Sequence, residues 1–582
     1  MIRSDVVESF GSQPARQQVV ALVGFLLVVL VGLSLYVRYV NTSTPLILDE
    51  TVYLWHARVL GTGSLTAPAS SHPLFVGSFF IPTRDGRRFG QYPIGFPLAL
   101  APWVLAGIPW GLNIALAGAA ILLLFRFARR LDGPGVAWTA AALTAVSPFF
   151  IVESTTLLSH PLTLVLSLFV LVSLERREAR SGPLRWAALA GFAIGYAINV
   201  SPFVAVPMAL VVLERWLRTR RRLPARVGEV AAFVFPILLG VGVFLAVNWR
   251  TVGSPWKTAY EYAQPTTQAG FGKTVGWKGG YTPADGVVNT ADRLASLNEW
   301  LFGWPVTSFT FAAPYVAWLA ISRFRRRRRE NNRRPVGAST SPPEPRDRWD
   351  STLLLLFAAT IGIYVFWFFP GTDSGLGPRY LYAALPAPIL FTARGLAGVA
   401  SAARRWSGNR PLAQTAARLL APGLILLLTT LGTVPYIVRM AGDGVASARR
   451  ATRAVLDEIA ARGIDRGTIL VESNSPAPRV HAFQYQSGFD AKGPLVFAES
   501  RSPQENARFV ADRGGGPVYY LQKRRGRVGW TLRDTPPRIP VQTPRARSEG
   551  AAAPDSGLTE SADHEDADPE SGGERTAPPT TR

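Results

Sequence analysis

Cysteine is absent from the chain of 582 residues, which excludes disulfide bonds, thiolate metal sites and cysteine nucleophiles. Charged residues are absent from long runs such as 19–36, 230–247 and 419–438. Each run has the roughly 18 to 20 residues that a helix needs to cross the hydrocarbon core of a bilayer. A convincing cleavable signal peptide is also lacking, because no small-residue cleavage site follows the first run. The chain is therefore predicted to be a multi-pass integral membrane protein.

The sequence carries a formal net charge of +23. In a soluble protein this charge would suggest nucleic acid, but no basic run here is interleaved with aromatic residues on a soluble module. Most arginines stand in short runs beside the apolar blocks, and such runs stay in the cytoplasm. We therefore expect no nucleic-acid partner, and a chain in the plasma (inner) membrane with its N-terminus cytoplasmic. Four clusters should face the cytoplasm: 126–130, 176–185, 215–226 and 323–334.

The alternation of these clusters with apolar blocks predicts an all-α polytopic fold with about eleven transmembrane helices. The long uncharged stretch 89–125 is divided at 107–109, so that 93–106 becomes a re-entrant or interfacial segment. Two long loops, 41–92 and 249–298, are predicted to be external; they are called the first and the second long loop below. The predicted spans are 19–36, 110–125, 136–152, 157–174, 186–200, 203–213, 230–247, 300–321, 353–369, 380–399 and 419–438.

The sequence divides into three parts. Residues 1–439 form the predicted transmembrane domain, and 440–535 form a small extracytoplasmic α/β domain. In that second part, helices are expected over 445–461 and 503–513, and strands over 468–471 and 517–521. Residues 536–582 are rich in Pro, Ser, Glu and Asp with few large apolar groups, a composition typical of a disordered tail.

Two adjacent carboxylates, Asp49 and Glu50, follow the apolar residues 46–48 close to the end of the first span. Carboxylates this near to lipid are costly and usually have a function. The alternative interpretation is that Asp49 caps the helix predicted over 51–58, since aspartate commonly precedes a first helical turn. The two roles are compatible with each other, and both stay open at this stage.

The turn that follows the span 136–152 contains Glu153 and His160. Seven positions apart on a continuous helix, the two side chains would share one face. Such a pair at the membrane surface indicates either interfacial polarity or part of a metal site.

A glycine-rich turn, 369–378, ends with Arg379 and Tyr380 at the mouth of the span 380–399. Arginine binds phosphate through a planar fork of donors and stays charged. The alternative is an interfacial anchor, in which Arg379 reaches the lipid headgroups and Tyr380 and Tyr382 belong to the aromatic belt.

Several short motifs occur in an order that resembles the GT-C class of membrane glycosyltransferases, particularly the relatives of protein O-mannosyltransferases and lipid A aminoarabinose transferases. The resemblance covers roughly Leu46 to Pro388, and each motif alone is short. The motifs are Asp49-Glu50 with Tyr53 and Ala57; Tyr92-Pro93-Ile94-Gly95-Phe96-Pro97; Asn248 with Gly253-Ser254-Pro255 and Tyr260; and Gly377-Pro378-Arg379-Tyr380-Leu381-Tyr382 with Leu385-Pro386.

This resemblance implies a polyprenyl-phosphate sugar donor at the outer leaflet and an inverting single displacement. By position it assigns the general base to Asp49, with Glu50 as its motif partner in catalysis, and the donor phosphate to Arg379 and Tyr380. Many relatives carry an aspartate in the second external turn, whereas here Ser159-His160-Pro161 occupies that region. No metal ligand is therefore assigned, and a divalent metal cofactor stays open. The remaining candidates are expected to line the substrate: Tyr53, Tyr92, His160 and Tyr260.

The predicted function is thus transfer of a sugar from the lipid carrier to an acceptor hydroxyl on a lipid, a polysaccharide or a protein. A carboxylate to deprotonate the acceptor and a cation for the leaving phosphate are sufficient for this chemistry. One alternative is a transporter or flippase, although the acidic pair stands at a membrane edge and the two halves of the sequence show no repeat. A non-catalytic assembly subunit is the other alternative.

Overall fold

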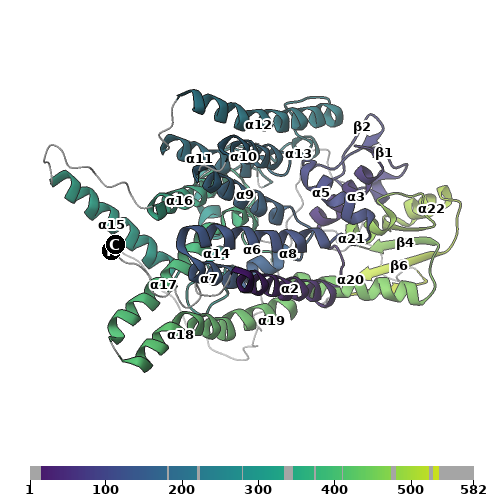
Figure 1. Ribbon diagram of the computed structural model, residues 1–582. Coiled ribbons are helices and arrows are strands. Elements are labelled where there is room, and N and C mark those ends of the chain that lie inside the picture. The colour runs from purple at the N-terminus through teal and green to yellow at the C-terminus, as the bar shows by residue number, and fades with distance from the viewer. Residues whose placement is uncertain are drawn as a thin grey trace, which may run out of the picture.

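The computed structural model describes residues 15–535 apart from 180–181, 219–222, 278, 333–344, 373–374, 409, 443, 473–479 and 524–528. The tail predicted to be disordered, 536–582, lies outside the described residues. The described chain consists of a bundle of long helices with a smaller region of loops and strands at one end (Figure 1).

The bundle is built from eleven principal helices of the described chain. Many of them begin with proline at the first or second helical position, where its fixed φ angle favours the helix and its missing N–H costs nothing. The helices are α2 (Ala15–Tyr39), α6 (Gly111–Asp132), α7 (Pro134–Val146), α9 (His160–Glu178), α10 (Pro183–Ile198), α11 (Pro202–Arg218), α12 (Leu223–Val252), α15 (Ala312–Asn332), α16 (Pro345–Tyr364), α17 (Pro386–Ser407) and α18 (Pro411–Leu428).

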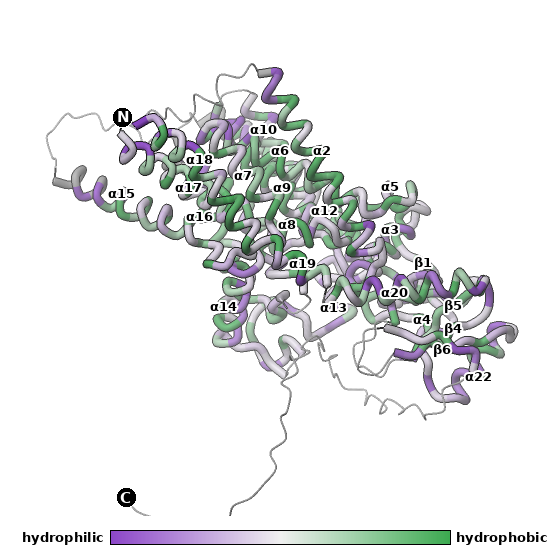
Figure 2. The backbone as a smooth tube through the Cα atoms, turned by 90° about the horizontal axis from the view of Figure 1, so that it is seen from below, coloured by the Kyte–Doolittle hydropathy of each residue, from purple (hydrophilic) through white to green (hydrophobic). Residues whose placement is uncertain are grey.

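Several of these helices are suited to a membrane. Among the described residues, α2, α6, α12 and the helical stretch that begins with α18 are long and apolar enough to cross one. The pair α7 and α8 (Pro148–Ser154), bent by 63°, would add a fifth span. Apolar residues predominate along α2, α6, α7 and α9, whereas polar residues gather outside the bundle, around α14 (Pro283–Trp300) and α22 (Pro503–Asp512) (Figure 2). The chain therefore has the character of a polytopic membrane protein, and the count of about eleven spans stays a prediction.

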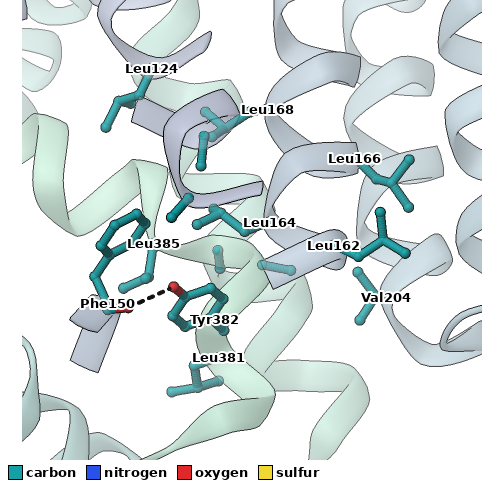
Figure 3. Close-up of a cluster of buried hydrophobic side chains, with 14 of the residues drawn as sticks. Leu124, Phe150, Leu162, Leu164, Leu166, Leu168, Val204, Leu381, Tyr382 and Leu385 are labelled. Atoms are coloured by element: carbon teal, nitrogen blue, oxygen red, sulfur yellow. Dashed lines mark hydrogen bonds between the residues drawn. The ribbon is translucent and has the colours of Figure 1, made fainter. Parts of the chain in front are cut away.

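The core of the bundle is rich in leucine. Leu168 of α9 lies near Leu124 of α6, and Leu164 lies one turn away on α9; all three are almost fully buried (Figure 3). Tyr382, also buried, donates a hydrogen bond of 3.4 Å to the carbonyl oxygen of Phe150 (Figure 3). A buried hydroxyl without a partner is costly, so this bond allows an aromatic ring with a polar end to occupy the core.

The predicted break at 107–109 agrees with the structure. The short helix α5 (Gly95–Leu105) ends there, and α6 begins at Gly111 after a turn through Gly107, whose φ angle is +75°. Glycine adopts this left-handed conformation without the steric cost that other residues incur. The short helix α5 and the following long helix α6 are thus separate elements.

The span predicted over 300–321 was wrong in its boundaries. Helix α14 ends at Trp300, residues 301–311 are not α-helical, and α15 begins only at Ala312. Gly303, with a φ angle of +60°, and the following Pro305 interrupt the helix. Phe302, inside the predicted span, is fully buried in the core. The apolar character of this stretch reflects core packing as well as membrane contact.

The first long loop is folded. It contains α3 (Leu48–Gly61), α4 (Pro73–Val76) and a small sheet with the strand order β1-β3-β2. These strands cover Ala67–Pro68 (β1), Thr83–Arg84 (β2) and Arg87–Arg88 (β3). The second long loop contains α13 (Ala259–Ala263) and most of α14.

Residues 444–535, called the C-terminal unit below, contain a four-stranded sheet with the order β5-β4-β6-β7. Strand β4 is parallel to β5 and β6, and β7 is antiparallel to β6. The predicted helices and strands of this region correspond to α20, α22, β4 and β6, whereas β5, β7 and the short α21 were not predicted. The elements are α20 (Gly444–Ala461), β4 (Gly467–Glu472), α21 (Val480–Gln484), β5 (Leu495–Glu499), α22, β6 (Val518–Lys523) and β7 (Trp530–Arg533).

The C-terminal unit packs against the first long loop, and both lie at the same end of the bundle (Figure 1). Phe75 and Val76 of α4 share a buried apolar cluster with Leu470, Val496 and Phe509 of the unit. Two regions far apart in the sequence therefore form one continuous structure beside the end of the bundle.

Candidate active site

Asp49 is the second residue of α3, in the first long loop. Its Oδ1 accepts a hydrogen bond of 2.6 Å from the hydroxyl of Tyr92. Its Oδ2 lies 3.6 Å from Nη1 of Arg379. The Asp49 side chain is 20% exposed, so the carboxylate combines two polar neighbours with access from outside the protein.

Arg379 begins the 3₁₀ helix η1 (Arg379–Ala384) directly after the glycine-rich turn, of which residues 373–374 lie outside the described chain. Its guanidinium carbon lies 5.5 Å from the ring centroid of Phe369 and 5.7 Å from that of Tyr380. The side chain is only 7% exposed. Among the described residues, Nη1 of Arg379 is buried and makes no hydrogen bond. A buried N–H group without a hydrogen bond is costly, so an anionic ligand that accepts a hydrogen bond from Nη1 would be bound favourably.

The electrostatic environment keeps Arg379 charged. Burial acts to lower its pKa, but the fields of Tyr380, Asp49 and Glu153 act in the opposite direction, and the pKa is raised overall. The cation therefore persists in a buried site, where its interaction with an anion is stronger than it is in water.

A series of neighbouring tyrosine and tryptophan rings, called the aromatic wall below, lies beside Asp49 and Arg379. The ring centroids of Tyr53 and Tyr92 are 4.7 Å apart, those of Tyr92 and Tyr260 are 5.8 Å apart, and those of Tyr260 and Trp367 are 5.9 Å apart. Burial raises the pKa of Tyr53, Tyr92 and Tyr260, so all three hydroxyls stay protonated and can donate hydrogen bonds. The predicted substrate-lining tyrosines thus lie together, from three separate segments of the chain.

Glu50 points away from this wall. It is fully buried, and its carboxylate accepts hydrogen bonds from the N–H groups of Leu46, Ile47 and Leu157 and pairs with Arg449. The capping role considered for Asp49 thus belongs to Glu50, because its side chain binds the backbone N–H groups that precede α3. Because both carboxylate oxygens of Glu50 bind groups of the protein itself, these contacts favour a structural role for Glu50 over the predicted catalytic role.

Glu153 and His160 do meet, although the continuous helix expected to join them is wrong. Helix α8 ends at Ser154, α9 begins at His160, and the intervening residues form a turn. Nδ1 of His160 lies 2.9 Å from Oε2 of Glu153. The imidazole ring of His160 is 6.4 Å from the ring of Tyr380, which places the pair beside Arg379. Oε1 of Glu153 is buried and has no hydrogen-bond partner among the described residues.

Sequence reasoning missed the residues that hold the glycine-rich turn. Arg293 of α14 donates hydrogen bonds of 2.7 to 3.0 Å to four backbone carbonyls. Trp367 donates from its indole N–H to the Tyr380 hydroxyl at 3.2 Å. Arg293 stands in a soluble-looking helix without a motif, and no sequence signal would have identified it. The four carbonyls belong to Tyr364, Trp367, Phe369 and Pro370.

Within the described part of the chain, no cluster of three or more histidine, aspartate or glutamate side chains is arranged to hold a metal ion. The Glu153–His160 pair brings together two side chains of the kinds that bind metals, one fewer than such a cluster requires.

Comparison with known proteins gives a clear result for the fold alone. No protein-family model matches the sequence, and a comparison with curated proteins also finds no match. Two solved structures of ArnT (lipid A aminoarabinose transferase) from Cupriavidus metallidurans are similar, one bound to undecaprenyl phosphate and one in the apo state.

The first of these ArnT structures has a TM-score of 0.52 and 13% sequence identity, and the alignment covers 88% of this chain and 94% of ArnT. The apo structure has a TM-score of 0.51 and 14% identity over 85% and 92% of the two chains. The oligosaccharyltransferase of Archaeoglobus fulgidus has a lower TM-score of 0.44 and 10% identity, over 86% and 69%. The chain therefore shares the overall fold of ArnT, a GT-C glycosyltransferase, which confirms the resemblance found in the sequence at the level of the fold.

Proposed function

We propose that this protein transfers a sugar from a polyprenyl-phosphate donor to an acceptor hydroxyl on the extracytoplasmic side of the plasma membrane. The observation that carries the proposal is the pairing of Asp49 with Arg379. A partly exposed carboxylate lies 3.6 Å from a buried guanidinium nitrogen that has no hydrogen-bond partner among the described residues. These are the two groups that the reaction requires, at one point of the structure.

In the proposed reaction, Asp49 accepts the proton of the acceptor hydroxyl while the acceptor oxygen attacks the anomeric carbon of the sugar. The bond between that carbon and the phosphate oxygen breaks, and polyprenyl phosphate leaves with the electron pair. Arg379 stabilises the negative charge on the leaving phosphate. A single displacement of this kind inverts the configuration at the anomeric carbon.

The 3.6 Å separation of Asp49 and Arg379 also fits this sequence of events. In the free enzyme the guanidinium partly neutralises Asp49. A donor phosphate bound to Nη1 would take over that cation and leave the carboxylate to contact the acceptor hydroxyl. The hydrogen bond from Tyr92 keeps Asp49 oriented meanwhile.

The surrounding residues supply contact surface. The neutral hydroxyls of Tyr53 and Tyr260 are suited to the hydroxyls of a sugar, and the rings of Tyr260 and Trp367 to its apolar face. His160, oriented by Glu153, borders the same space next to Tyr380. ArnT, whose fold this chain shares, was solved with undecaprenyl phosphate bound, which supports a lipid phosphate as donor.

The decisive experiment is an assay of the purified protein, reconstituted into sealed proteoliposomes, with a panel of radiolabelled polyprenyl-phosphate sugars. Membranes of the native cells would supply the lipid, polysaccharide and protein acceptors. We expect one sugar to be transferred and free polyprenyl phosphate to be released in equal amount, with Asp49→Asn as the inactive control. Movement of an intact donor across the bilayer, with neither product, would identify a flippase instead.

A further inference from the structure

Three separate segments of the chain meet at the carboxylate of Glu50. Its Oε2 accepts hydrogen bonds from the backbone N–H groups of Leu46 at 3.0 Å and Ile47 at 3.1 Å. Its Oε1 accepts one of 3.0 Å from Leu157, in the turn between α8 and α9. The same oxygen lies 2.8 Å from Nη2 of Arg449, and both charged side chains are completely buried.

Arg449 comes from the C-terminal unit, 399 positions along the chain from Glu50. It lies on α20, and its Nη1 donates a hydrogen bond to the carbonyl oxygen of Thr44. The guanidinium therefore binds two residues at the start of α3: the carbonyl oxygen of Thr44, before the helix, and the carboxylate of Glu50, in its first turn. Next to it, Leu46 packs against Ala448 in a small buried cluster.

The rest of the C-terminal unit contacts the first long loop along its length. Gln484 donates a hydrogen bond of 2.8 Å to the carbonyl oxygen of Phe75. Arg88 of β3 donates to the carbonyl oxygen of Phe489 and lies 3.7 Å from the carboxylate of Asp490. The C-terminal unit thus packs against the loop that carries Asp49, and the contact includes the Glu50–Arg449 pair.

We infer that the C-terminal unit is a positioning element for catalysis, and that Arg449 and Glu50 are the positioning residues that hold Asp49 against Arg379. The catalytic half of this inference rests on the proposed function. Asp49 and Glu50 are adjacent in the first turn of α3, so whatever fixes Glu50 fixes the start of the helix and with it the Asp49 carboxylate. A displacement of about 1 Å at a reacting group can slow a reaction roughly a hundredfold.

Two variants test the inference without leaving a buried charge unpaired. Arg449→Lys keeps the positive charge but loses the fork that reaches Thr44 and Glu50 together. The double variant Glu50→Gln/Arg449→Gln removes both charges, which proteins tolerate far better than the loss of one partner. Arg453→Gln is the matched control, because Arg453 lies on the same helix, is 46% exposed and pairs with Asp457 at 2.9 Å.

The first readout is steady-state transfer. We expect the kcat of the double variant to fall by roughly a hundredfold, with an unchanged dissociation constant for the donor lipid, because Arg379 stays in place. Arg449→Lys should fall in the same direction by a smaller factor, and Arg453→Gln should match wild type. A folded double variant with wild-type kcat would overturn the inference, and if that variant does not fold, the same criterion applies to Arg449→Lys.

The second readout needs no activity. The chain has no cysteine, so Asp49→Cys introduces a single thiol, at a side chain that is 20% exposed. We expect a maleimide to label this thiol roughly tenfold faster when Arg449→Lys or the double substitution is added, because local opening of the α3 start becomes easier. Arg453→Gln should leave the rate unchanged. An unchanged rate in all backgrounds refutes positioning, whereas a faster rate in a protein that transfers no sugar refutes only the proposed function.

Discussion

The hydroxyl of Tyr92 donates a 2.6 Å hydrogen bond to Oδ1 of Asp49, across 43 positions of the first long loop. Tyr92 precedes the short apolar helix α5, and Asp49 stands in the first turn of α3. The bond therefore ties the beginning of the loop to its end, at the level where the chain returns to the bundle. Because the Tyr92 hydroxyl donates to Oδ1, Oδ2 is the Asp49 oxygen that faces Arg379.

Replacement of Asp49 by asparagine should abolish most of the transfer activity. Asp49→Asn keeps the size of the side chain and an oxygen that can accept the Tyr92 hydrogen bond, but it cannot take a proton. We expect kcat to drop by roughly a hundredfold or more, the usual scale for the loss of a general base, with melting temperature and donor binding little changed. Product formation from the radiolabelled donor measures the effect.

Asp85→Asn is the matched control for this substitution. Asp85 lies in the same loop, is 81% exposed and has a φ angle of +50°, a conformation that asparagine adopts readily. It should retain wild-type turnover. Near-normal turnover of Asp49→Asn would show that another group accepts the proton.

Arg379 should be needed for donor affinity. Arg379→Lys retains a positive charge but loses the planar fork and the N–H group that is free in the buried site. Hydrogen bonds to charged groups contribute about 1.5 to 3 kcal/mol, so we expect the dissociation constant of the donor lipid to rise roughly tenfold to a hundredfold. Binding of a fluorescent polyprenyl phosphate to the purified protein measures it.

Arg250→Lys distinguishes phosphate binding from membrane anchoring. Arg250 is an exposed arginine in the last turn of α12, at the helix end that is predicted to lie at the external membrane surface. If Arg379 were an anchor of the same kind, the two lysine variants would bind the donor equally well. We expect only Arg379→Lys to bind it weakly.

Local sequence signals were sufficient for much of this site. The motif residues Asp49, Tyr92 and Arg379 were identified without the structure, and the structure brings them into contact. Short motifs preserve the identity of the polar groups that meet at this point, and apolar runs preserve the position of most long helices. The break before α6 was predicted as well, because glycine and proline act locally on the backbone.

The supporting contacts could not be predicted in the same way. Arg449 pairs with Glu50 from 399 positions away, and Arg293 binds backbone carbonyls at the end of α16 and at the start of the glycine-rich turn, more than 70 positions along the chain. A buried arginine and an exposed one look alike in a sequence. Hydropathy was likewise unable to separate core from lipid at Phe302, since both environments favour the same residues.

The predicted orientation in the membrane can be tested with introduced thiols, because the chain has no cysteine. Thr62 and Lys257 are exposed residues of the two long loops, and Thr415 is an exposed residue near the start of α18, in a basic stretch. An impermeant maleimide applied to intact cells should label Thr62→Cys and Lys257→Cys but spare Thr415→Cys until the cells are lysed. The reverse pattern would place Asp49 in the cytoplasm and remove the basis for an outer-leaflet donor.

The last prediction concerns stability against acid, and it depends on His56. This residue of α3 is 2% exposed, and burial lowers the pKa of its imidazole from 6.5 to about 4. At any pH between these two values the unfolded chain binds a proton at His56 and the folded chain does not, so protonation favours unfolding.

The contribution of a neutral His56 to stability is therefore complete above pH 6.5 and is lost progressively as the pH falls from 6.5 toward 4. A shift of this size corresponds to about 3 kcal/mol over that interval. Replacement of the imidazole by a ring of similar size that cannot be protonated, His56→Phe, should remove this part of the pH dependence. His72→Gln is the control, because His72 lies in the same loop with its side chain 21% exposed beside Asp512.

Thermal unfolding of the detergent-purified proteins at a series of pH values would reveal the difference. Wild type and His72→Gln should lose stability with the same slope as the pH is lowered below 6.5, and His56→Phe should lose distinctly less. The comparison uses slopes, so a constant packing penalty in His56→Phe does not affect it. Equal slopes in all three proteins would mean that His56 is already protonated in the folded state, and that the start of the first long loop opens to water well before the bundle unfolds.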